Sequence, residues 1–218
     1  MLEHWINPAA LAIVFGGTVA ATMLRCGWAD TRHALRGLKT LFEPAFDVAK
    51  AKGEMAKQIR DIADAGFVRA EPHHFGDQEF DYLADMMISQ RSINSLHEEH
   101  QKYKEARMIQ ALRAFRTFES AADLAPILGL AGTLIALGQA PAGAHHAGGL
   151  VDAIAMAVVT TLYGLVTANF VFAPLANAIE RKSRREEHDR EEVLEWLADG
   201  LRRVGLRPGE SGKDKAAA

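Results

Sequence analysis

The sequences APILGLAGTLIAL at 125–137 and AIAMAVVTTLYGLVTANFVFAPLANA at 153–178 decide the fold of this chain. Both segments are apolar and rich in small residues. Each carries hydroxyl groups near its middle, Thr133 in the first segment and Thr160 and Thr161 in the second. A short connection with a proline and several glycines separates them. Such a pair is typical of two antiparallel transmembrane helices.

Apolar and charged residues are segregated along the 218-residue chain. The mean hydropathy of -0.06 would suit a soluble protein, but three windows hold almost no charge and the residues between the first two are densely charged. A soluble core helix seldom runs so long without a polar face. We therefore predict a membrane protein whose charged mass lies outside the bilayer. The net charge of -3, with no basic stripe, does not indicate nucleic-acid binding, and the single Cys26 excludes an internal disulfide.

A third apolar stretch, PAALAIVFGGTVAATML, lies at 8–24. Its uncharged residues would form a helix of roughly 25 Å, which just spans a bilayer. Glu3 and His4 are the ionisable residues before it, and a signal peptide needs a basic region there, so we predict a retained span. Gly16 and Gly17 give this helix a small face that lets a neighbouring helix approach closely.

Basic residues predict the orientation of the chain. They follow the first span, precede the second and follow the third, whereas the N-terminus and the 138–149 loop carry no Lys or Arg. By the positive-inside rule, the N-terminus and this loop are periplasmic. The predicted parts are a first transmembrane helix with a periplasmic N-terminus at 1–25, a cytoplasmic helical domain at 26–120, a second transmembrane helix at 121–138, a periplasmic loop at 139–149, a third transmembrane helix at 150–178, a cytoplasmic helix at 179–205 and a disordered tail at 206–218.

The charged segments show the apolar spacing of helices throughout. After a predicted loop at 71–76, apolar residues recur at threes and fours, so we predict one long helix from about Gln78 directly into the second span. The third span is predicted to continue as a helix to Leu201. The expected fold class is an all-α membrane protein with three transmembrane helices and long cytoplasmic helical extensions.

The sequence HEEH at 97–100 invites a metalloprotease interpretation. That motif needs three residues between its histidines and here there are two, so it is not met. We predict that His97 and His100 lie on a solvated helix face. The pairs His73–His74 and His145–His146 fall in predicted loops where nothing completes a ligand set. No nucleophile, base and orienting group lie together, so we predict neither a metal site nor an enzyme.

The threonines within the spans are the strongest candidate site. A threonine in a helix most often bonds a carbonyl of its own helix one turn back, and this alternative stays open for each of them. Three threonines in two helices that pack together, beside a proline, favour an ion pathway, because hydroxyls and freed carbonyls replace part of an ion's hydration shell. Asp123 and Asp152 lie near helix ends. Such a pathway therefore lacks a deep carboxylate, which another chain must supply.

These motifs resemble a known family, the MotA/TolQ/ExbB proton channel family of motor subunits. The stretches NPAALAIVFGGTVAATMLR at 7–25, APILGLAGT at 125–133 and AMAVVTTLYGLVTANFVFAPLA at 155–176 are similar to three consecutive spans of MotA-type flagellar stator subunits. MotA-type subunits have four spans and this chain begins where their second begins, so we expect the three-span plan of TolQ and ExbB. The resemblance implies an inner-membrane, ion-conducting, MotA-like subunit that couples H⁺ or Na⁺ flow to rotation.

The resemblance also implies partners and residue roles. It implies a homopentamer in the lipid bilayer around a single-span MotB/ExbD/TolR-like subunit whose membrane aspartate takes and releases the ion, a contact with a flagellar rotor protein, and no cofactor. Arg60 is expected to stand in for an arginine of the family's loop pattern, whose place Ala63 occupies. The implied roles are the ion pathway for Thr133, Thr160 and Thr161, conformational coupling for Pro126 and Pro174, the rotor or partner interface for Arg60 and Glu71, and helix packing for Gly16, Gly17, Gly129 and Gly132.

Two alternatives stay open. One is a TolQ- or ExbB-like energiser of outer-membrane processes or transport. The other is a non-conducting membrane scaffold whose cytoplasmic helices recruit partners. The transported ion also stays open, because threonines occur in both proton and sodium members of the family.

Overall fold

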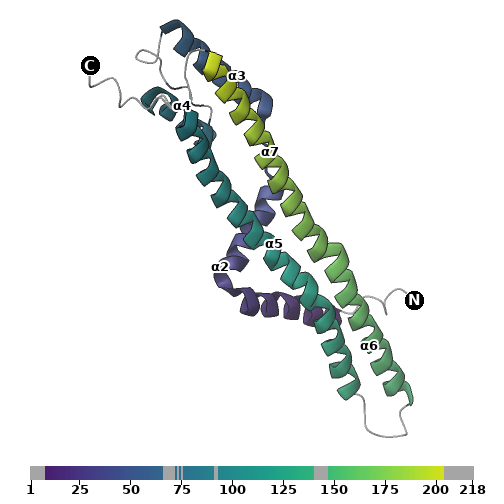
Figure 1. Ribbon diagram of the computed structural model, residues 1–218. Coiled ribbons are helices and arrows are strands. Elements are labelled where there is room, and N and C mark those ends of the chain that lie inside the picture. The colour runs from purple at the N-terminus through teal and green to yellow at the C-terminus, as the bar shows by residue number, and fades with distance from the viewer. Residues whose placement is uncertain are drawn as a thin grey trace. The chain divides into compact units, whose positions relative to one another are not determined.

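The computed structural model describes residues 8–65, 72, 74, 76–90, 93–139 and 147–203 (Figure 1). Every regular element in this part of the chain is helical. The elements are α1 (Pro8–Leu11), η2 (Ala12–Gly16), α2 (Gly17–Phe42), α3 (Val48–Ala65), α4 (Gln78–Gln90), α5 (Ile93–Gly138), α6 (Ala147–Val166), η3 (Thr167–Phe172) and α7 (Ala173–Arg203), where η2 and η3 are π-helical.

Three of the described helices are long and apolar enough to cross a membrane. They are Ala12–Phe42, Ile93–Gly138 and Gly149–Arg203. The predicted all-α class with three spans is confirmed. The third of these helices runs without a break from α6 through η3 to the end of α7, so the predicted continuation to Leu201 is also confirmed.

The chain divides into two compact units. The span unit comprises Met1–Glu43 and Gln110–Lys182, and the charged unit comprises Pro44–Ile109 and Ser183–Ala218. The long helices α5 and α7 contribute residues to both units. The candidate threonines belong to the span unit, whereas the histidines of the HEEH sequence belong to the charged unit.

The first apolar helix of the span unit bends at Gly27, where α2 changes direction (Figure 1). Gly27 has φ 85° and ψ 161°, a conformation that is essentially restricted to glycine. Before the bend, a Cβ added at Gly17 would lie 3.0 Å from Cδ1 of Leu128 in α5. A Cβ added at Gly16 would meet no described atom within 4 Å. Of these two glycines, Gly17 is therefore the one at a close helix contact.

The π-helical segment η3 ends at Phe172, two residues before Pro174. Proline has no N–H and its ring crowds the carbonyl four residues earlier, and a π turn relieves this crowding by widening the helix locally. Phe172 at the end of η3 stacks on Phe15 of η2, with ring centroids 5.8 Å apart and planes inclined by 15°. The two π-helical segments of the span unit therefore contact each other.

The predicted single helix from Gln78 into the second span is wrong. α4 ends at Gln90 and α5 begins at Ile93. The side chains of Glu79 and His100, 21 residues apart, approach to 2.5 Å, whereas one continuous helix would hold them roughly 30 Å apart. The chain therefore turns back, because the apolar stripes of α4 and of the first turns of α5 must each be buried against another helix.

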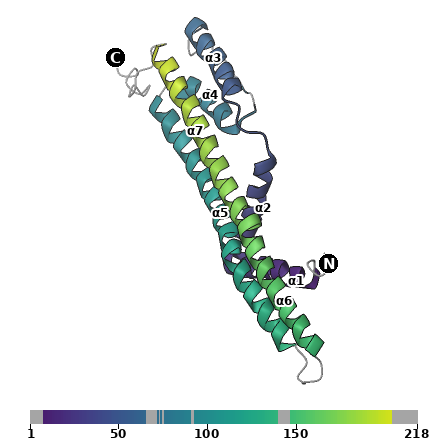
Figure 2. The ribbon, with the colours of Figure 1, turned by 90° about the vertical axis from the view of Figure 1, so that its right-hand side faces the viewer.

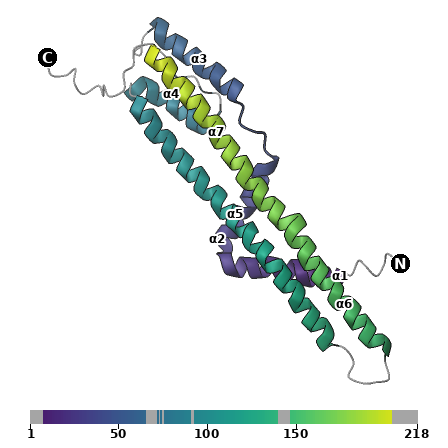
Figure 3. The same ribbon diagram turned by 45° about the vertical axis from the view of Figure 1, so that its right-hand side comes forward.

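The core of the charged unit combines apolar side chains from four helices. α3 runs beside the C-terminal part of α7 (Figures 2 and 3), where a Cβ added at Gly200 would lie 2.5 Å from Cδ1 of Ile59. The fully or almost fully buried members of this core are Ala51, Met55, Ile62, Phe80, Leu83, Ala84, Met86, Met87, Ile93, Leu96, Val193, Leu194, Leu197, Ala198 and Leu201.

Candidate functional site

Two of the candidate threonines, Thr160 and Thr161, lie at a close contact between α5 and α6. A Cβ added at Gly164 would lie 2.7 Å from the carbonyl oxygen of Ala125 and 3.0 Å from Cα of Gly129. A Cβ added at Gly132 would lie 3.1 Å from Cβ of Thr160. Since real Cβ atoms do not approach other atoms within 3.0 Å, position 164 requires glycine if this contact is to be kept. The sequence analysis singled out Gly129 and Gly132 but not Gly164.

Thr160 and Thr161 of α6 lie against glycines of α5. Thr160 is buried and packs on Gly132, the residue before Thr133. Thr133 and Thr161 are half-buried. A Cβ added at Gly129 would lie 3.3 Å from Cα of Thr161, so both threonines of α6 pack on the α5 segment that leads to Thr133.

Each of these hydroxyl groups donates a hydrogen bond to its own helix. Thr133 Oγ1 donates to the carbonyl of Leu130 at 2.6 Å. The Oγ1 atoms of Thr160 and Thr161 both donate to the carbonyl of Ala157, at 2.9 and 3.2 Å. In this structure each hydroxyl proton is therefore donated to a carbonyl of the same helix. The oxygen lone pairs remain as acceptors, and acceptor oxygens are what a cation needs.

The spans carry no acidic residue at the level of the threonines. In the segments 8–25, 121–138 and 150–178 the acidic residues are Asp123 and Asp152, and both are exposed. They precede Thr133 and Thr160 by ten and eight residues, which is roughly 15 and 12 Å along a helix. The hydroxyl groups thus have no carboxylate of their own chain beside them along their helices.

The remaining predicted site residues are placed as follows. Pro126 takes part in the α5–α6 contact, since its Cα lies 3.2 Å from a Cβ added at Gly164. Pro174 is exposed at the start of α7. Arg60 is exposed on α3. Glu71, like Gly66 before it and the histidines at 73, 145 and 146, lies outside the described residues.

A buried ionic network in the charged unit was not predicted from the sequence. At its centre is Glu79 of α4, whose side chain is 1% exposed. Its carboxylate accepts hydrogen bonds from Nδ1 of His100 at 2.5 Å, from Nη1 of Arg107 at 2.7 Å and from Nη1 of Arg190 at 2.9 Å. These three donors come from α5 and α7, so the network links three helices.

His100 corrects the prediction of a solvated HEEH face. His97 is exposed as expected, but His100 is 4% exposed. It lies four residues after Leu96 and seven after Ile93, both buried, and therefore on the same face of the helix. Its Nε2 is buried without a hydrogen-bond partner in the described part of the chain.

Two bidentate pairs complete the network. Arg107 donates to both carboxylate oxygens of Glu187, at 2.5 and 2.9 Å. Arg190 donates to both oxygens of Asp77, at 3.1 and 2.8 Å, and its guanidinium lies 4.4 Å from the centre of the Phe46 ring. Planar fork-to-fork pairing of this kind is strong and fixes geometry as well as charge.

The network keeps its buried carboxylates ionised. Burial raises the pKa of Glu79, but the hydrogen bond from His100 and the charge of Arg107 together lower this pKa further, so that it lies below its ordinary value of 4.5. The pKa of Asp77 is lowered in the same way, since burial is outweighed by the hydrogen bonds and charge of Arg190.

A sequence signal for this network exists in α7. Its buried stripe reads at intervals of three and four through Glu187, Arg190, Leu194, Leu197 and Leu201. Two charged residues thus occupy positions of an apolar stripe. This pattern is difficult to recognise in the sequence, because many other charged residues of the same run lie on the remaining faces of the helix.

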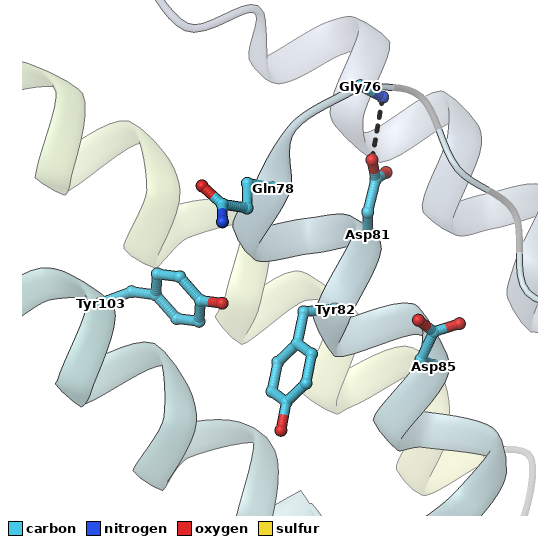
Figure 4. A pocket seen from close by; sticks show the side chains of 6 residues that line it. All are labelled: Gly76, Gln78, Asp81, Tyr82, Asp85 and Tyr103. Carbon is cyan, nitrogen blue, oxygen red and sulfur yellow. Dashed lines mark hydrogen bonds between the residues drawn. The ribbon is translucent and has the colours of Figure 1, made fainter.

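A shallow hollow of about 460 Å³ lies on the charged unit (Figure 4). It is lined by Gly76, Gln78, Asp81, Tyr82, Asp85 and Tyr103. Asp81 accepts a hydrogen bond from the Gly76 N–H at 3.2 Å, and Asp85 lies 3.1 Å from Nε2 of His74. Since these carboxylates are already paired within the chain, we assign the hollow no ligand.

Comparison with known proteins identifies the family of this chain. A model of the MotA/TolQ/ExbB proton channel family matches residues 55–192. The chain belongs to this family. Motility protein A of Aquifex aeolicus is 28% identical over 197 residues, which cover 85% of this chain and 75% of the relative. Motility protein A of Bacillus subtilis is 26% identical over 213 residues, covering 89% and 74%, and PomA of Vibrio alginolyticus is 23% identical over 198 residues, covering 88% and 77%.

Solved structures agree on the fold. The flagellar MotAB stator complex of Bacillus subtilis matches with a TM-score of 0.82 at 23% identity, over 92% of this chain and 80% of that one. The MotAB structure of C. jejuni matches with a TM-score of 0.81 at 16% identity, over 93% and 82%. The predicted family, MotA-like fold, inner-membrane location and channel rather than enzyme class are confirmed. The chain is a MotA/PomA-like ion-channel subunit of the flagellar stator type.

Proposed function

We propose that this chain forms the ion pathway of a stator together with a MotB-like single-span partner, and that H⁺ or Na⁺ flow through it drives rotation. The observation that carries the proposal is the α5–α6 contact, where Thr160 and Thr161 pack on the α5 segment that leads to Thr133 and no carboxylate of this chain lies along the helices beside these hydroxyls. The solved relatives are complexes of MotA with MotB. A membrane aspartate of such a partner would supply the missing acid.

The threonines would act as fixed acceptors beside that aspartate. Because Thr160 and Thr161 commit their protons to one carbonyl, that of Ala157, their oxygen lone pairs are left to face a cation. An ion leaving water would exchange part of its hydration shell for these oxygens before it reaches the carboxylate. Thr160 is held in place by Gly132, so its position depends on the helix contact.

The prolines would let the helices respond to the state of the carboxylate. Pro126 cannot donate to the carbonyl of Ala122, and Pro174 cannot donate to that of Phe170. Helices with such gaps bend at lower cost than regular ones. We assign to both prolines the coupling of ion binding to a change in helix shape, with Pro174 acting next to the π-helical segment η3.

The assembly would be a homopentamer around the partner. Apolar side chains of the span helices support an assembly, since Leu134 is 71% exposed and Val158 is 64% exposed in the single chain. Lipid and neighbouring copies would cover them. Arg60 on the exposed surface of α3, together with Glu71, would contact the rotor protein.

The decisive experiment removes one hydroxyl and keeps the shape. In proteoliposomes that contain this chain and its partner, Thr161→Val should abolish ion flux, whereas Thr161→Ser should retain most of it because the oxygen remains. The matched control is Thr22→Val, since Thr22 is a buried threonine of the first span that likewise bonds to its own helix, donating to the carbonyl of Thr18 at 2.7 Å. Full flux in Thr161→Val, with assembly unchanged, would show that this oxygen does not lie on the pathway.

A further inference from the structure

The segment of α2 that follows the Gly27 bend has an exposed face of unusual composition. Trp28, Leu35 and Phe42 are 72%, 62% and 85% exposed. They are spaced by seven residues, so they form one stripe along the helix. Such large apolar side chains in one row on a helix surface indicate a contact with something outside the chain.

Basic residues border this stripe. Arg32, Arg36 and Lys39 are all exposed. At 100° per residue, they lie between roughly 20° and 80° from Trp28 around the helix, on the side away from Leu35 and Phe42. We call the face formed by Trp28, Arg32, Leu35, Arg36, Lys39 and Phe42 the basic-apolar face.

The opposite side of the same segment is fixed within the span unit. Ala34 is 3% exposed, and a Cβ added at Gly37 would lie 2.7 Å from Cβ of Ala114 and 3.6 Å from Cδ1 of Ile179. Lys182 donates to the carbonyls of Thr40 and Glu43 at the end of α2. Packing therefore orients the basic-apolar face outward.

The segment lies close to the level at which the spans leave the bilayer. It begins at Trp28, four residues after the last residue of the uncharged stretch 8–24. Its contact residue Ile179 immediately follows the third apolar segment, and Ala114 precedes the second by seven residues, roughly 10 Å of helix. The headgroup layer is about 5–7 Å thick on each side and lipid charge acts over a Debye length of about 8 Å. Long basic side chains in this segment thus lie within reach of the membrane surface.

We propose that the basic-apolar face binds the anionic phospholipid headgroups of the membrane that the chain spans. Tryptophan and other large apolar side chains enter the interfacial layer while arginine and lysine contact lipid phosphates. Two copies that met through this same face would bring like charges together, which disfavours a symmetric pairing of the face with itself. Continuity with the first span favours the membrane, and this contact is separate from the ion pathway proposed above.

The fluorescence of Trp28 provides the test. The full chain is reconstituted in liposomes with lipids brominated near the top of the acyl chain, either phosphatidylglycerol or phosphatidylcholine, each diluted into unlabelled lipid. The Trp28→Phe variant, measured in parallel, gives the contribution of Trp5 and Trp196, which is subtracted. We expect stronger quenching of Trp28 by brominated phosphatidylglycerol than by brominated phosphatidylcholine.

Variants separate charge at this face from overall charge. In Arg32→Gln/Arg36→Gln/Lys39→Gln the preference for phosphatidylglycerol should fall by roughly five-fold for each removed charge. The attraction of one basic residue to an anionic surface changes the affinity by about this factor. The control Lys57→Gln/Lys102→Gln/Arg202→Gln removes three exposed charges of the charged unit. It should keep the preference. Equal quenching by the two lipids, or no quenching because another protein chain covers Trp28, would overturn the proposal.

Discussion

Glu79→Gln tests how strongly the buried network holds the charged unit together. The substitution keeps the shape of the side chain and removes its charge. Glu79 is 1% exposed and faces two guanidinium groups that are 25% and 10% exposed, those of Arg107 and Arg190. Removing one partner of a buried ionic cluster costs about 3–5 kcal/mol. We expect about 3 kcal/mol, the lower end, because Arg107 keeps Glu187 and Arg190 keeps Asp77.

Hydrogen exchange of the α4 amides measures this loss directly, because those amides exchange when the charged unit opens. A loss of about 3 kcal/mol corresponds to exchange roughly 150-fold faster under conditions where opening is at equilibrium. The control is Glu192→Gln, which breaks the Lys52–Glu192 pair, whose side chains are 27% and 53% exposed. An exposed pair of this kind contributes little to stability, because solvent screens it. If the two variants exchanged at the same rate, the network would be a consequence of the fold rather than a support of it.

Two further predictions concern the α5–α6 contact and the acid stability of the charged unit. Gly164→Ala should push α5 and α6 apart, because its Cβ would lie 2.7 Å from the Ala125 carbonyl oxygen; we expect a cost of about 1–3 kcal/mol in thermal unfolding and reduced ion flux, whereas Gly16→Ala, which meets nothing within 4 Å, should change neither. Because the folded pKa values of Asp77 and Glu79 are lowered, their stabilisation is present above their ordinary values of 3.8 and 4.5 and is lost as pH falls through the folded values. Acid unfolding followed by circular dichroism should therefore be less steep in Glu79→Gln, and an unchanged acid transition would contradict this assignment.

The spans and the family could be predicted from the sequence because both depend on local patterns. A run without charge forms a helix in lipid whatever surrounds it, since its backbone must bond internally. The motifs around Thr133 and Thr161 also contain small residues. The structure shows why these are needed, since Gly132 lies against Thr160 at the helix contact. Gly164 was missed because a single glycine in an apolar helix has the same sequence signature whether or not a backbone lies against it.

The turn between α4 and α5 could not be predicted from periodicity. The apolar spacing on the two sides of the turn is compatible with one helix, and residues between Gln90 and Ile93 include neither proline nor glycine. The turn lets the apolar stripes of α4 and of the first turns of α5 pack on other helices, and it brings Glu79 to His100 and to arginines of α5 and α7 that lie far away in the sequence. Long-range ionic pairs of this kind carry no local signal, so a sequence reading favours the longer helix.

The π-helical segments also depend on a local feature that the sequence shows and on a distant contact that it does not show. Pro174 marks a position where the regular helix must yield, and proline is visible in the sequence. It does not specify where the strain is absorbed. In the structure the π-helical turn is η3, which ends two residues before Pro174 and where Phe172 stacks on Phe15 at 5.8 Å. Phe15 itself lies in η2, a π-helical segment without a proline. The stacking thus joins two π-helical segments that are distant in sequence, a contact that the local sequence of neither segment specifies.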